Sequence, residues 1–144
     1  MVAFADTGFI ASLYLEESTS EAADAALGTD LGSLPLTPLL MLELRNAFNR
    51  AVQRQRITVS ERDALWQNVE ADVASGFLVP TPVASAELHE KARQLSDRHT
   101  PALGTRSLDL LHVAAALNLK AEVFFSFDER QRQAAASEGL KVKP

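Results

Sequence analysis

The sequence contains no cysteine, which excludes disulfide bonds and thiolate metal sites from this chain. It also lacks an apolar run that approaches the roughly 20 residues of a membrane-spanning helix. The first residues show neither the basic region nor the long apolar region of a signal peptide. These absences predict a cytoplasmic protein that does not enter a membrane.

Positive charge is scarce as well, with 14 Lys and Arg residues against 19 Asp and Glu residues and a net charge of −5. Proteins that bind nucleic acids are more often basic, so this balance counts against that class unless several carboxylates are metal ligands. The length of 144 residues and the hydrophobic content of 47% are typical of a globular chain with a single core. We therefore expect one domain over residues 1–144.

Short apolar runs alternate with longer segments of helical periodicity along the chain. Strands are expected at residues 2–5, 32–36, 77–79 and 122–127, with a short edge strand in "LKVK". Helices are expected at residues 8–15, 20–27, 38–55, 82–98, 105–119 and 129–138, and in the region 60–73. This alternation predicts an α/β fold with a mainly parallel sheet, and the continuously apolar strands indicate helices on both of its faces.

Local signals predict several of the helix ends. The Thr-Pro pairs at 37–38 and 81–82 each place a capping residue before a proline at the first helical position. The stretch 60–63, Ser-Glu-Arg-Asp, resembles a capping box. Thr105 is expected to cap a helix, and residues 99–104, which contain a proline and a glycine, are expected to form a loop.

Four acidic residues that lie far apart in the sequence are expected near one edge of the sheet. Asp6 and Asp128 each follow an expected strand, so in a parallel sheet both lie at the carboxyl-end rim where open α/β sheets bind ligands. Asp109 lies near the start of the helix that leads into the last long strand. Glu43 lies in the second turn of the helix that follows the second expected strand. The topology therefore predicts that four carboxylates converge.

Each of these acids also has an ordinary structural explanation. Asp6 and Asp128 fit the preferences of helix N-caps, and one carboxylate can serve both as a cap and as a ligand. Asp109 is favoured by the dipole of its helix. Glu43 interrupts the apolar face of "LLMLELRNAF", which makes a solvated position less convincing for it.

Clustered carboxylates repel and raise one another's pKa values, and a bound divalent cation removes that conflict. Mg²⁺ and Mn²⁺ prefer such oxygen ligands. The histidines His89, His99 and His112 lack the spacing of a zinc site. His112 lies three residues after Asp109 on one helical face, where it could line the site or simply pack.

Four stretches together resemble the PIN-domain family and, within it, the VapC-type toxins of bacterial type II toxin–antitoxin pairs. They are "FADTGFIASLYL", "LLMLELRNAF", "GTRSLDLLHVAAAL", and "VFFSFDERQ" followed by "AAASEGLKV". Each stretch is a weak signal alone. Their order, spacing and helix–strand setting are specific together, and the resemblance covers nearly the whole chain.

The resemblance implies a three-layer α/β/α fold with a central, mainly parallel sheet. It also implies that Asp6, Glu43, Asp109 and Asp128 form a catalytic constellation that holds one or two Mg²⁺ or Mn²⁺ ions. The implied activity is an endoribonuclease, a hydrolase of RNA phosphodiester bonds. The implied partners are a second copy of the chain and a cognate VapB-like antitoxin.

Five further residues are expected to support this site. Ser126 resembles the small hydroxyl residue that often precedes the last family acid by two positions, and Thr7 is expected either to support the acids or to cap the first helix. Arg45 and Arg106 each lie within three residues of a proposed ligand. A guanidinium at such a position is suited to contact RNA phosphates. An ion pair or a solvent-exposed position on the helix explains each arginine as well. His112 is a third candidate for RNA contact.

Two other functions remain open from the sequence. A haloacid-dehalogenase-type phosphatase also places an aspartate after its first strand, but it needs a second aspartate two residues later, where this chain has Gly8. A catalytically weak or inactive PIN-fold binding protein fits the residues too. Metal-dependent RNA cleavage that disappears in an Asp6→Asn variant would separate the enzyme from the binding protein.

Overall fold

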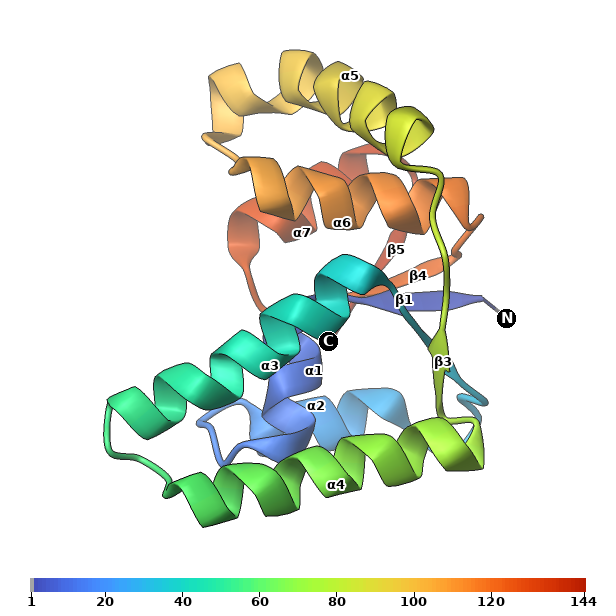
Figure 1. The fold of residues 1–144 in the computed structure, drawn as a ribbon. Helices are drawn as coiled ribbons and strands as arrows, with labels where there is room; N and C mark the ends of the chain where they lie inside the picture. The colour runs from blue at the N-terminus through green and yellow to red at the C-terminus, as the bar shows by residue number, and fades with distance from the viewer. Residues whose placement is uncertain (1) are drawn as a thin grey trace. The chain divides into compact units, whose positions relative to one another are not determined.

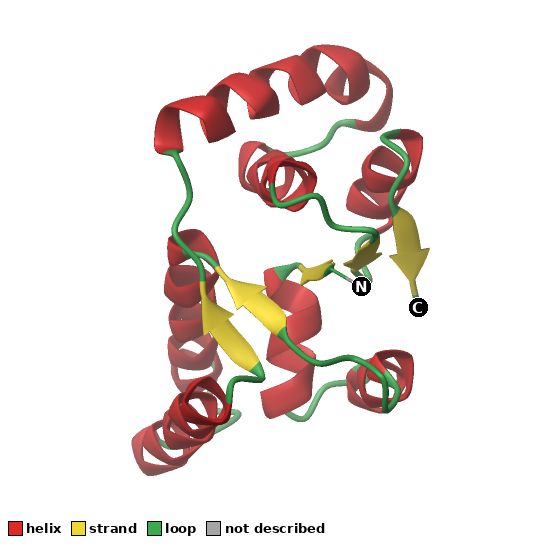
Figure 2. Cartoon of the chain, turned by 90° about the vertical axis from the view of Figure 1, so that its right-hand side faces the viewer, coloured by secondary structure: helices red, strands yellow, loops and turns green. Residues whose placement is uncertain are grey.

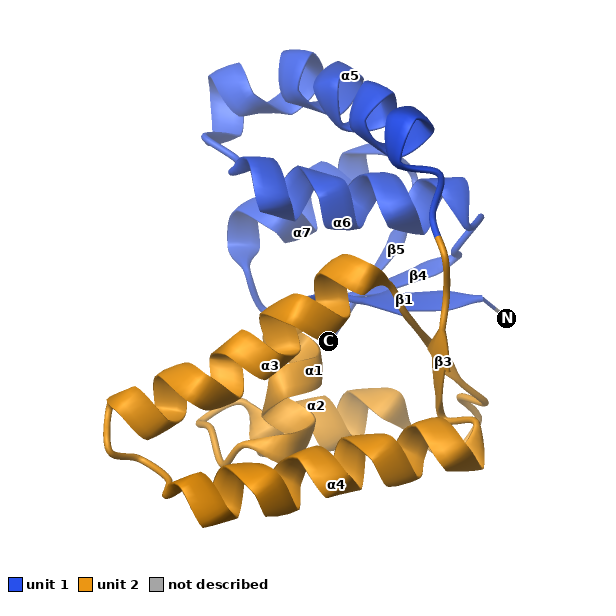
Figure 3. Ribbon diagram, viewed as in Figure 1, with its two compact units in different colours: residues 1–6, 83–144 blue, residues 7–82 orange. Residues whose placement is uncertain are grey.

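The computed structural model describes residues 2–144, which form seven helices and five strands. The chain divides into two compact units, coloured separately in Figure 3. The first unit comprises the residues up to Asp6 together with Val83–Pro144, and the second unit comprises Thr7–Pro82. None of the helices in residues 2–144 is long and apolar enough to cross a membrane.

The first unit is built on a three-stranded parallel sheet. β1 (Ala3–Ala5) pairs with β4 (Val123–Phe125), and β4 pairs in turn with β5 (Lys141–Lys143). Phe4 lies opposite Phe124 in the register, and their rings stack with centroids 5.9 Å apart. Every residue of β1 and β4 is buried, which explains why both strands are continuously apolar in sequence.

Three helices complete the first unit. They are α5 (Ser85–Leu103), α6 (Ser107–Asn118) and α7 (Glu129–Ser137). Figure 1 shows α5 and α6 running side by side, and α6 also packs against α7. Ala114 on α6 and Ala134 on α7 are fully buried, and such short side chains let neighbouring helices approach closely. The helices therefore supply most of the core that three-residue strands alone cannot provide.

The second unit contains two parallel strands, β2 (Leu34–Leu36) and β3 (Leu78–Pro80), which appear as neighbouring arrows in Figure 2. Its helices are α1 (Thr7–Tyr14), α2 (Ser20–Leu27), α3 (Pro38–Gln53) and α4 (Val59–Ser75). The fully buried ring of Phe48 makes edge-on contacts with Tyr14 and Trp66, at centroid distances of 6.2 and 5.9 Å. These aromatic contacts join α1, α3 and α4.

The two Thr-Pro pairs behave differently in the structure. Thr37 caps α3 as predicted, because its hydroxyl oxygen accepts a backbone N–H from the first turn. The prediction for the pair at 81–82 is wrong. The Thr81 N–H donates to the carbonyl of Leu36 at 2.9 Å, and its hydroxyl donates to the carbonyl of Val79 at 2.7 Å. Thr81 thus continues the strand pairing, and α5 begins only beyond this pair.

Two further helix boundaries are corrected. The capping box lies at Thr58 and Glu61 rather than at 60–63, with each side chain bonded to the other residue's backbone N–H. The segment 99–104 is mostly helical instead of a loop, because Pro101 is accommodated in the last turn of α5, where its missing N–H removes a single bond to the carbonyl four residues earlier. Gly104 ends the helix with a left-handed φ of +67°.

Thr105 does not cap the next helix. Arg106 occupies the cap position of α6, and the Thr105 hydroxyl instead lies 2.7 Å from that of Thr100. The strands also differ slightly from the expectation. The third strand begins one residue later than residue 77, and the strand expected at 122–127 is confined to β4.

Candidate functional site

The carboxylate of Asp6 lies directly beyond β1 in the first unit. The Asp6 N–H donates to the carbonyl of Phe125 at 3.0 Å, which continues the pairing of β1 with β4. The side chain is only 5% exposed, and its Oδ2 accepts a hydrogen bond from the Ser126 hydroxyl at 2.5 Å. Ser126 is fully buried, so its hydroxyl is dedicated to contacts inside the protein. The chain thus holds a buried carboxylate at the carboxyl ends of two parallel strands.

Asp128 lies beyond β4, at the same end of the sheet as Asp6. Its backbone N–H donates to Ser126 Oγ at 3.1 Å, so one hydroxyl contacts both acidic residues. Its Oδ1 accepts the backbone N–H of Gln131 at 2.9 Å and caps α7, as the sequence predicted. The second carboxylate oxygen of Asp128 is not used by this cap, so capping leaves it an oxygen for a further contact.

Asp109 lies in the first turn of α6 and is linked to Asp128 through one buried side chain. The Gln131 side-chain amide donates to the backbone carbonyl of Asp109 at 3.2 Å. The Asp109 carboxylate accepts a bond from Nε of Arg106 at 3.3 Å, and this Arg106 side chain is 76% exposed. An ion pair with so exposed a partner contributes little to stability, and Arg106 can exchange its contact for another anion.

Glu43 belongs to the second unit, where it lies on α3. Its Oε1 accepts a hydrogen bond from the Thr7 hydroxyl at 2.8 Å, which joins α3 to the first residue of α1. Thr7 directly follows Asp6 in the sequence. The Thr7 hydroxyl therefore orients the fourth acid, a role that the sequence offered for Thr7 as an alternative to helix capping.

The other two residues expected to contact RNA make internal contacts. The guanidinium carbon of Arg45 lies 5.0 Å from the centre of the Trp66 ring, which is a cation–π geometry in the second unit. His112 is 3% exposed, and its ring centroid lies 6.1 Å from that of Phe4 in the first unit. These contacts support packing roles for both side chains, and Arg106 remains the exposed cation among the three candidates.

The donor chemistry of the acids fits a hard divalent cation. Asp6, Asp109, Asp128 and Glu43 offer carboxylate oxygens only, which Mg²⁺ and Mn²⁺ prefer. Among residues 2–144, no group of three or more Asp, Glu, His or Cys side chains is arranged so that it could hold an ion directly. Mg²⁺ usually keeps several of its waters, so a fit through water is consistent with these residues.

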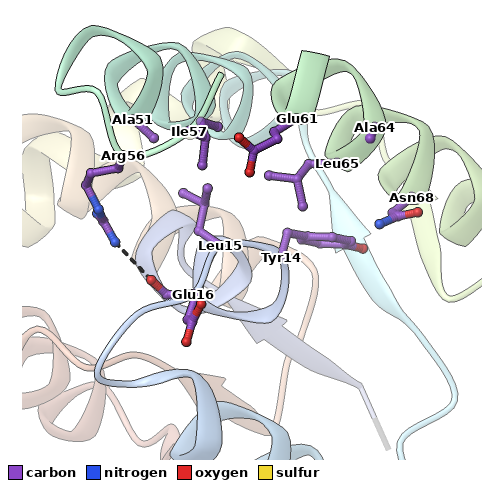
Figure 4. A pocket seen from close by; sticks show the side chains of 10 residues that line it. All are labelled: Tyr14, Leu15, Glu16, Ala51, Arg56, Ile57, Glu61, Ala64, Leu65 and Asn68. Atoms are coloured by element: carbon purple, nitrogen blue, oxygen red, sulfur yellow. Dashed lines mark hydrogen bonds between the residues drawn. The ribbon is translucent and has the colours of Figure 1, made fainter. Parts of the chain in front are cut away.

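A separate hollow of about 580 Å³ lies in the second unit between the end of α1 and the helices α3 and α4. Figure 4 shows Tyr14, Leu15 and Leu65 pointing into it, while Arg56 at its rim donates to the carbonyl of Glu16 at 2.9 Å. Burial, reinforced by a hydrogen bond and the charge of Asp72, raises the pKa of the Tyr14 phenol above its usual range. The hollow is lined by apolar side chains such as Leu15 and Leu65 together with the charged side chains of Glu16, Arg56 and Glu61.

Gln131 was missed by the sequence reasoning. The spacing Asp128-x-x-Gln131 matches the first and last positions of a capping box, and that signal could have singled it out. The expected site residues were four acids, two arginines, a histidine and two hydroxyl residues, and no amide was among them.

A family model described as the PIN domain matches residues 3–137 of the chain. No curated protein matches the chain in sequence. Solved structures with a similar fold include the following three. VapC20 of Mycobacterium tuberculosis, a sarcin-ricin loop cleaving toxin, aligns with a TM-score of 0.70 and 19% identity over 99% of both chains. FitAcB from Neisseria gonorrhoeae aligns with a TM-score of 0.68 and 17% identity over 99% of this chain and 97% of its own.

The third structure is VapBC2 from Rickettsia felis bound to a DNA fragment from their promoter, with a TM-score of 0.67 and 11% identity over 99% of this chain and 98% of its own. At these identities the likeness concerns the fold. The expected α/β fold with a mainly parallel sheet is confirmed by the family match and by these alignments.

Proposed function

The chain belongs to the PIN-domain family, and on that premise we propose that it is a metal-dependent endoribonuclease, the toxin of a toxin–antitoxin pair. One observation carries the proposal. In the first unit, Asp6, Asp128 and the Asp109 backbone belong to one hydrogen-bonded chain that passes through Ser126 and Gln131. A fold that needed only two helix caps and a helix dipole would not require these buried connections.

Asp6, Glu43, Asp109 and Asp128 are proposed to hold one or two Mg²⁺ or Mn²⁺ ions, directly or through water. PIN domains generally depend on divalent metals, which supports this assignment. When bound, such an ion lowers the pKa of water and stabilises negative charge on a phosphodiester. The protein contributes carboxylates whose positions are fixed before substrate binds, as the bond from Ser126 to Asp6 illustrates.

Arg106 is proposed to bind the RNA backbone. Its guanidinium is exposed and is paired with Asp109 at 3.3 Å through a weak surface contact. A metal ion taken up by the Asp109 carboxylate would free Arg106 for a phosphate oxygen. Arg45 and His112 are not part of this proposal, because their contacts with Trp66 and Phe4 explain their positions.

A cognate VapB-like antitoxin is proposed as the protein partner, with a homodimer as the assembled form and the cytoplasm as the location. The fold is similar to that of chains solved within VapBC and FitAB toxin–antitoxin complexes, which supports the antitoxin. The hollow beside Tyr14, Leu15 and Leu65 supports a docking site for an apolar antitoxin segment, since α1 and α3 contribute Tyr14 and Ala51 to its lining.

The decisive experiment is cleavage of total cellular RNA by the purified protein with Mg²⁺ or Mn²⁺, followed by mapping of the new RNA ends. We expect discrete cleavage that stops with a chelator and in Asp6→Asn. An Asp97→Asn variant is the matched control, because Asp97 is an exposed acid on α5 outside the proposed site. Cleavage that persists in Asp6→Asn, or that ignores the chelator, would contradict the proposal.

One observation favours a second candidate, a PIN-fold binding protein with little catalysis. The Asp109 carboxylate is already paired with Arg106, and a cation beside a ligand competes with metal. If the wild-type chain binds an antitoxin and RNA but leaves every RNA intact with either metal, this candidate replaces the enzyme.

A further inference from the structure

We propose that Gln131 is a positioning residue that sets Asp109 and Asp128 relative to each other. The inference rests on the proposed function, in which both acids hold metal. Gln131 lies in the first turn of α7 and is only 2% exposed. Its backbone N–H donates to Oδ1 of Asp128 at 2.9 Å, and its side-chain amide donates to the Asp109 carbonyl at 3.2 Å. One residue therefore contacts both acids through different groups.

The side chain of Gln131 departs from the usual capping arrangement. In a capping box, the Glu or Gln at the third helical position reaches back to the N–H of the cap residue. In this structure the Asp128 N–H donates to Ser126 Oγ at 3.1 Å instead. Ser126 Oγ thus accepts the N–H that the Gln131 side chain would accept in a capping box. The Gln131 amide donates instead to the Asp109 carbonyl on α6.

The bond to Asp109 joins two helix starts that the sequence separates widely. The Asp109 carbonyl lies in the first turn of α6, and the bond from Gln131 ties this turn to the first turn of α7. Burying an amide costs free energy unless the amide is hydrogen-bonded, so a buried Gln among the alanines of α7 indicates a specific use. That use is to fix the backbone from which the Asp109 carboxylate projects.

Residues that orient metal ligands typically change metal affinity by about 10- to 100-fold when they are replaced. Gln131→Met is the suitable variant, because it keeps a long unbranched side chain and the backbone bond to Asp128 but removes the amide donor. Gln133→Met is the matched control, since Gln133 lies on the same helix, is exposed, and bonds only with Glu129 among the contacts found for its side chain. Gln131→Asn is a second variant, whose amide is too short to reach α6.

Two measurements on the full chain test the role. Titration calorimetry gives the Mn²⁺ affinity, and amide hydrogen exchange without metal reports the first turn of α6. We expect Gln131→Met and Gln131→Asn to weaken Mn²⁺ binding by about tenfold and to speed exchange in that turn, with Gln133→Met like wild type. These readouts do not require RNA cleavage.

Mn²⁺ affinities within twofold of wild type in both Gln131 variants would overturn the inference. Equal weakening in Gln133→Met would also overturn it, because a general loss of helix stability would then explain the effect. A wild-type chain that binds no Mn²⁺ would refute the proposed function, and the positioning role would fall with it. Normal wild-type binding with unaffected Gln131 variants would refute the positioning role alone.

Discussion

The Ser126 hydroxyl lies 2.5 Å from Oδ2 of Asp6 and joins the residue after β4 to the carboxylate after β1. Both groups are buried, with Ser126 fully enclosed. A hydroxyl that donates to a carboxylate stabilises its charged form and restricts its orientation. The proposed metal site therefore depends on a neutral residue as much as on its acids.

Ser126→Ala should lower both stability and metal binding. The change removes one donor from the buried Asp6 carboxylate and one acceptor from the Asp128 N–H, and each group loses a partner inside the protein. We expect a loss of about 1–3 kcal/mol in the free energy of unfolding, measured by urea denaturation, together with weaker Mn²⁺ binding. Ser137→Ala is the control, because Ser137 is exposed and its hydroxyl donates to a helix carbonyl. An unchanged stability in Ser126→Ala would contradict the importance of this bond.

Asp109→Asn should damage activity more than folding. The amide keeps the shape of the side chain but loses the ligand charge, while the exposed pair with Arg106 contributes little to stability. Without metal we expect a melting temperature at least equal to that of wild type. Added Mn²⁺ should stabilise the variant less, and RNA cleavage should fall by at least about tenfold. Equal Mn²⁺ stabilisation and equal cleavage in both proteins would leave only a helix-dipole role for Asp109.

The contacts of Glu138 lead us to expect a smaller free energy of unfolding in acid. Its hydrogen bond from Arg98 lowers the pKa of this carboxyl below its ordinary value of 4.5; the contact with His99 acts in the same direction, whereas partial burial opposes them. A lowered folded-state pKa contributes stability above the ordinary value, and that contribution is lost as the pH falls through the lowered one.

Thermal melting of Glu138→Gln and wild type should therefore differ at neutral pH, and the difference should shrink below the ordinary pKa of the carboxyl and vanish only below its lowered pKa in the folded state. Glu90→Gln is the control, because Glu90 forms an exposed pair with Arg93. A difference that persists unchanged in acid would show that the charge of Glu138 is not what stabilises the fold.

The raised pKa of the Tyr14 phenol leads us to expect a second pH effect, at alkaline pH. The chain contains one tyrosine, so the ultraviolet absorbance of phenolate reports Tyr14 alone. Burial is the main cause of its raised pKa, and the hydrogen bond to Asp72 adds to it. The folded chain should therefore show no phenolate near pH 10, where the urea-unfolded chain ionises. Stability tied to this group is complete below that pH and falls as the pH rises further.

The same titration on Asp72→Asn separates the two causes of this raised pKa. We expect the phenol to stay protonated beyond pH 10 in this variant, because burial remains, but to ionise earlier than in wild type. An ordinary titration in the folded wild type would contradict the burial of the phenol.

The hollow in the second unit gives a prediction about the antitoxin. Leu65→Glu places a charge among the apolar side chains that line it, so antitoxin binding measured by calorimetry should weaken by more than tenfold. Leu108→Glu is the control, because Leu108 is an exposed leucine of the first unit. Equal affinity of both variants, with folding verified by circular dichroism, would place the antitoxin elsewhere. Leu13 on α1 and Leu39 on α3 are the next positions to test.

The sequence predicted the element order because strong local signals and tertiary contacts agree in most of the chain. Thr37-Pro38 begins α3 as expected, and the Thr37 hydroxyl oxygen accepts the backbone N–H of Leu40. At the second pair, the backbone N–H of Thr81 donates to the carbonyl of Leu36 on the neighbouring strand. Leu36 lies more than forty residues away in the sequence, so local sequence signals do not reveal this contact. The predicted helix start at this pair is wrong because the Thr81 backbone pairs with a distant strand.

The places of the candidate acids and the hydroxyls of Ser126 and Thr7 beside them were expected from the sequence, whereas the contacts of Gln131 were not. Asp6 and Asp128 stand after strands that are recognisable from their apolar residues. The Gln131 amide donates to Asp109 because the Asp128 N–H is already bonded to Ser126 Oγ. This choice of partners depends on the folded structure and has no signal in the sequence. The helical spacing of His112 from Asp109 left two places for its ring open, and the ring packs near Phe4.

β5 forms one edge of the three-stranded sheet of the first unit. Its two lysines, Lys141 and Lys143, discourage any further strand from pairing there, and Arg132 donates to the carbonyls of both Ser126 and Pro144 at 2.8 Å. The charged side chains therefore make it unfavourable for a strand of another chain to pair with β5, which is a common route to aggregation. This protection is built from the chain's own residues, so in the proposed toxin it would not depend on a bound antitoxin.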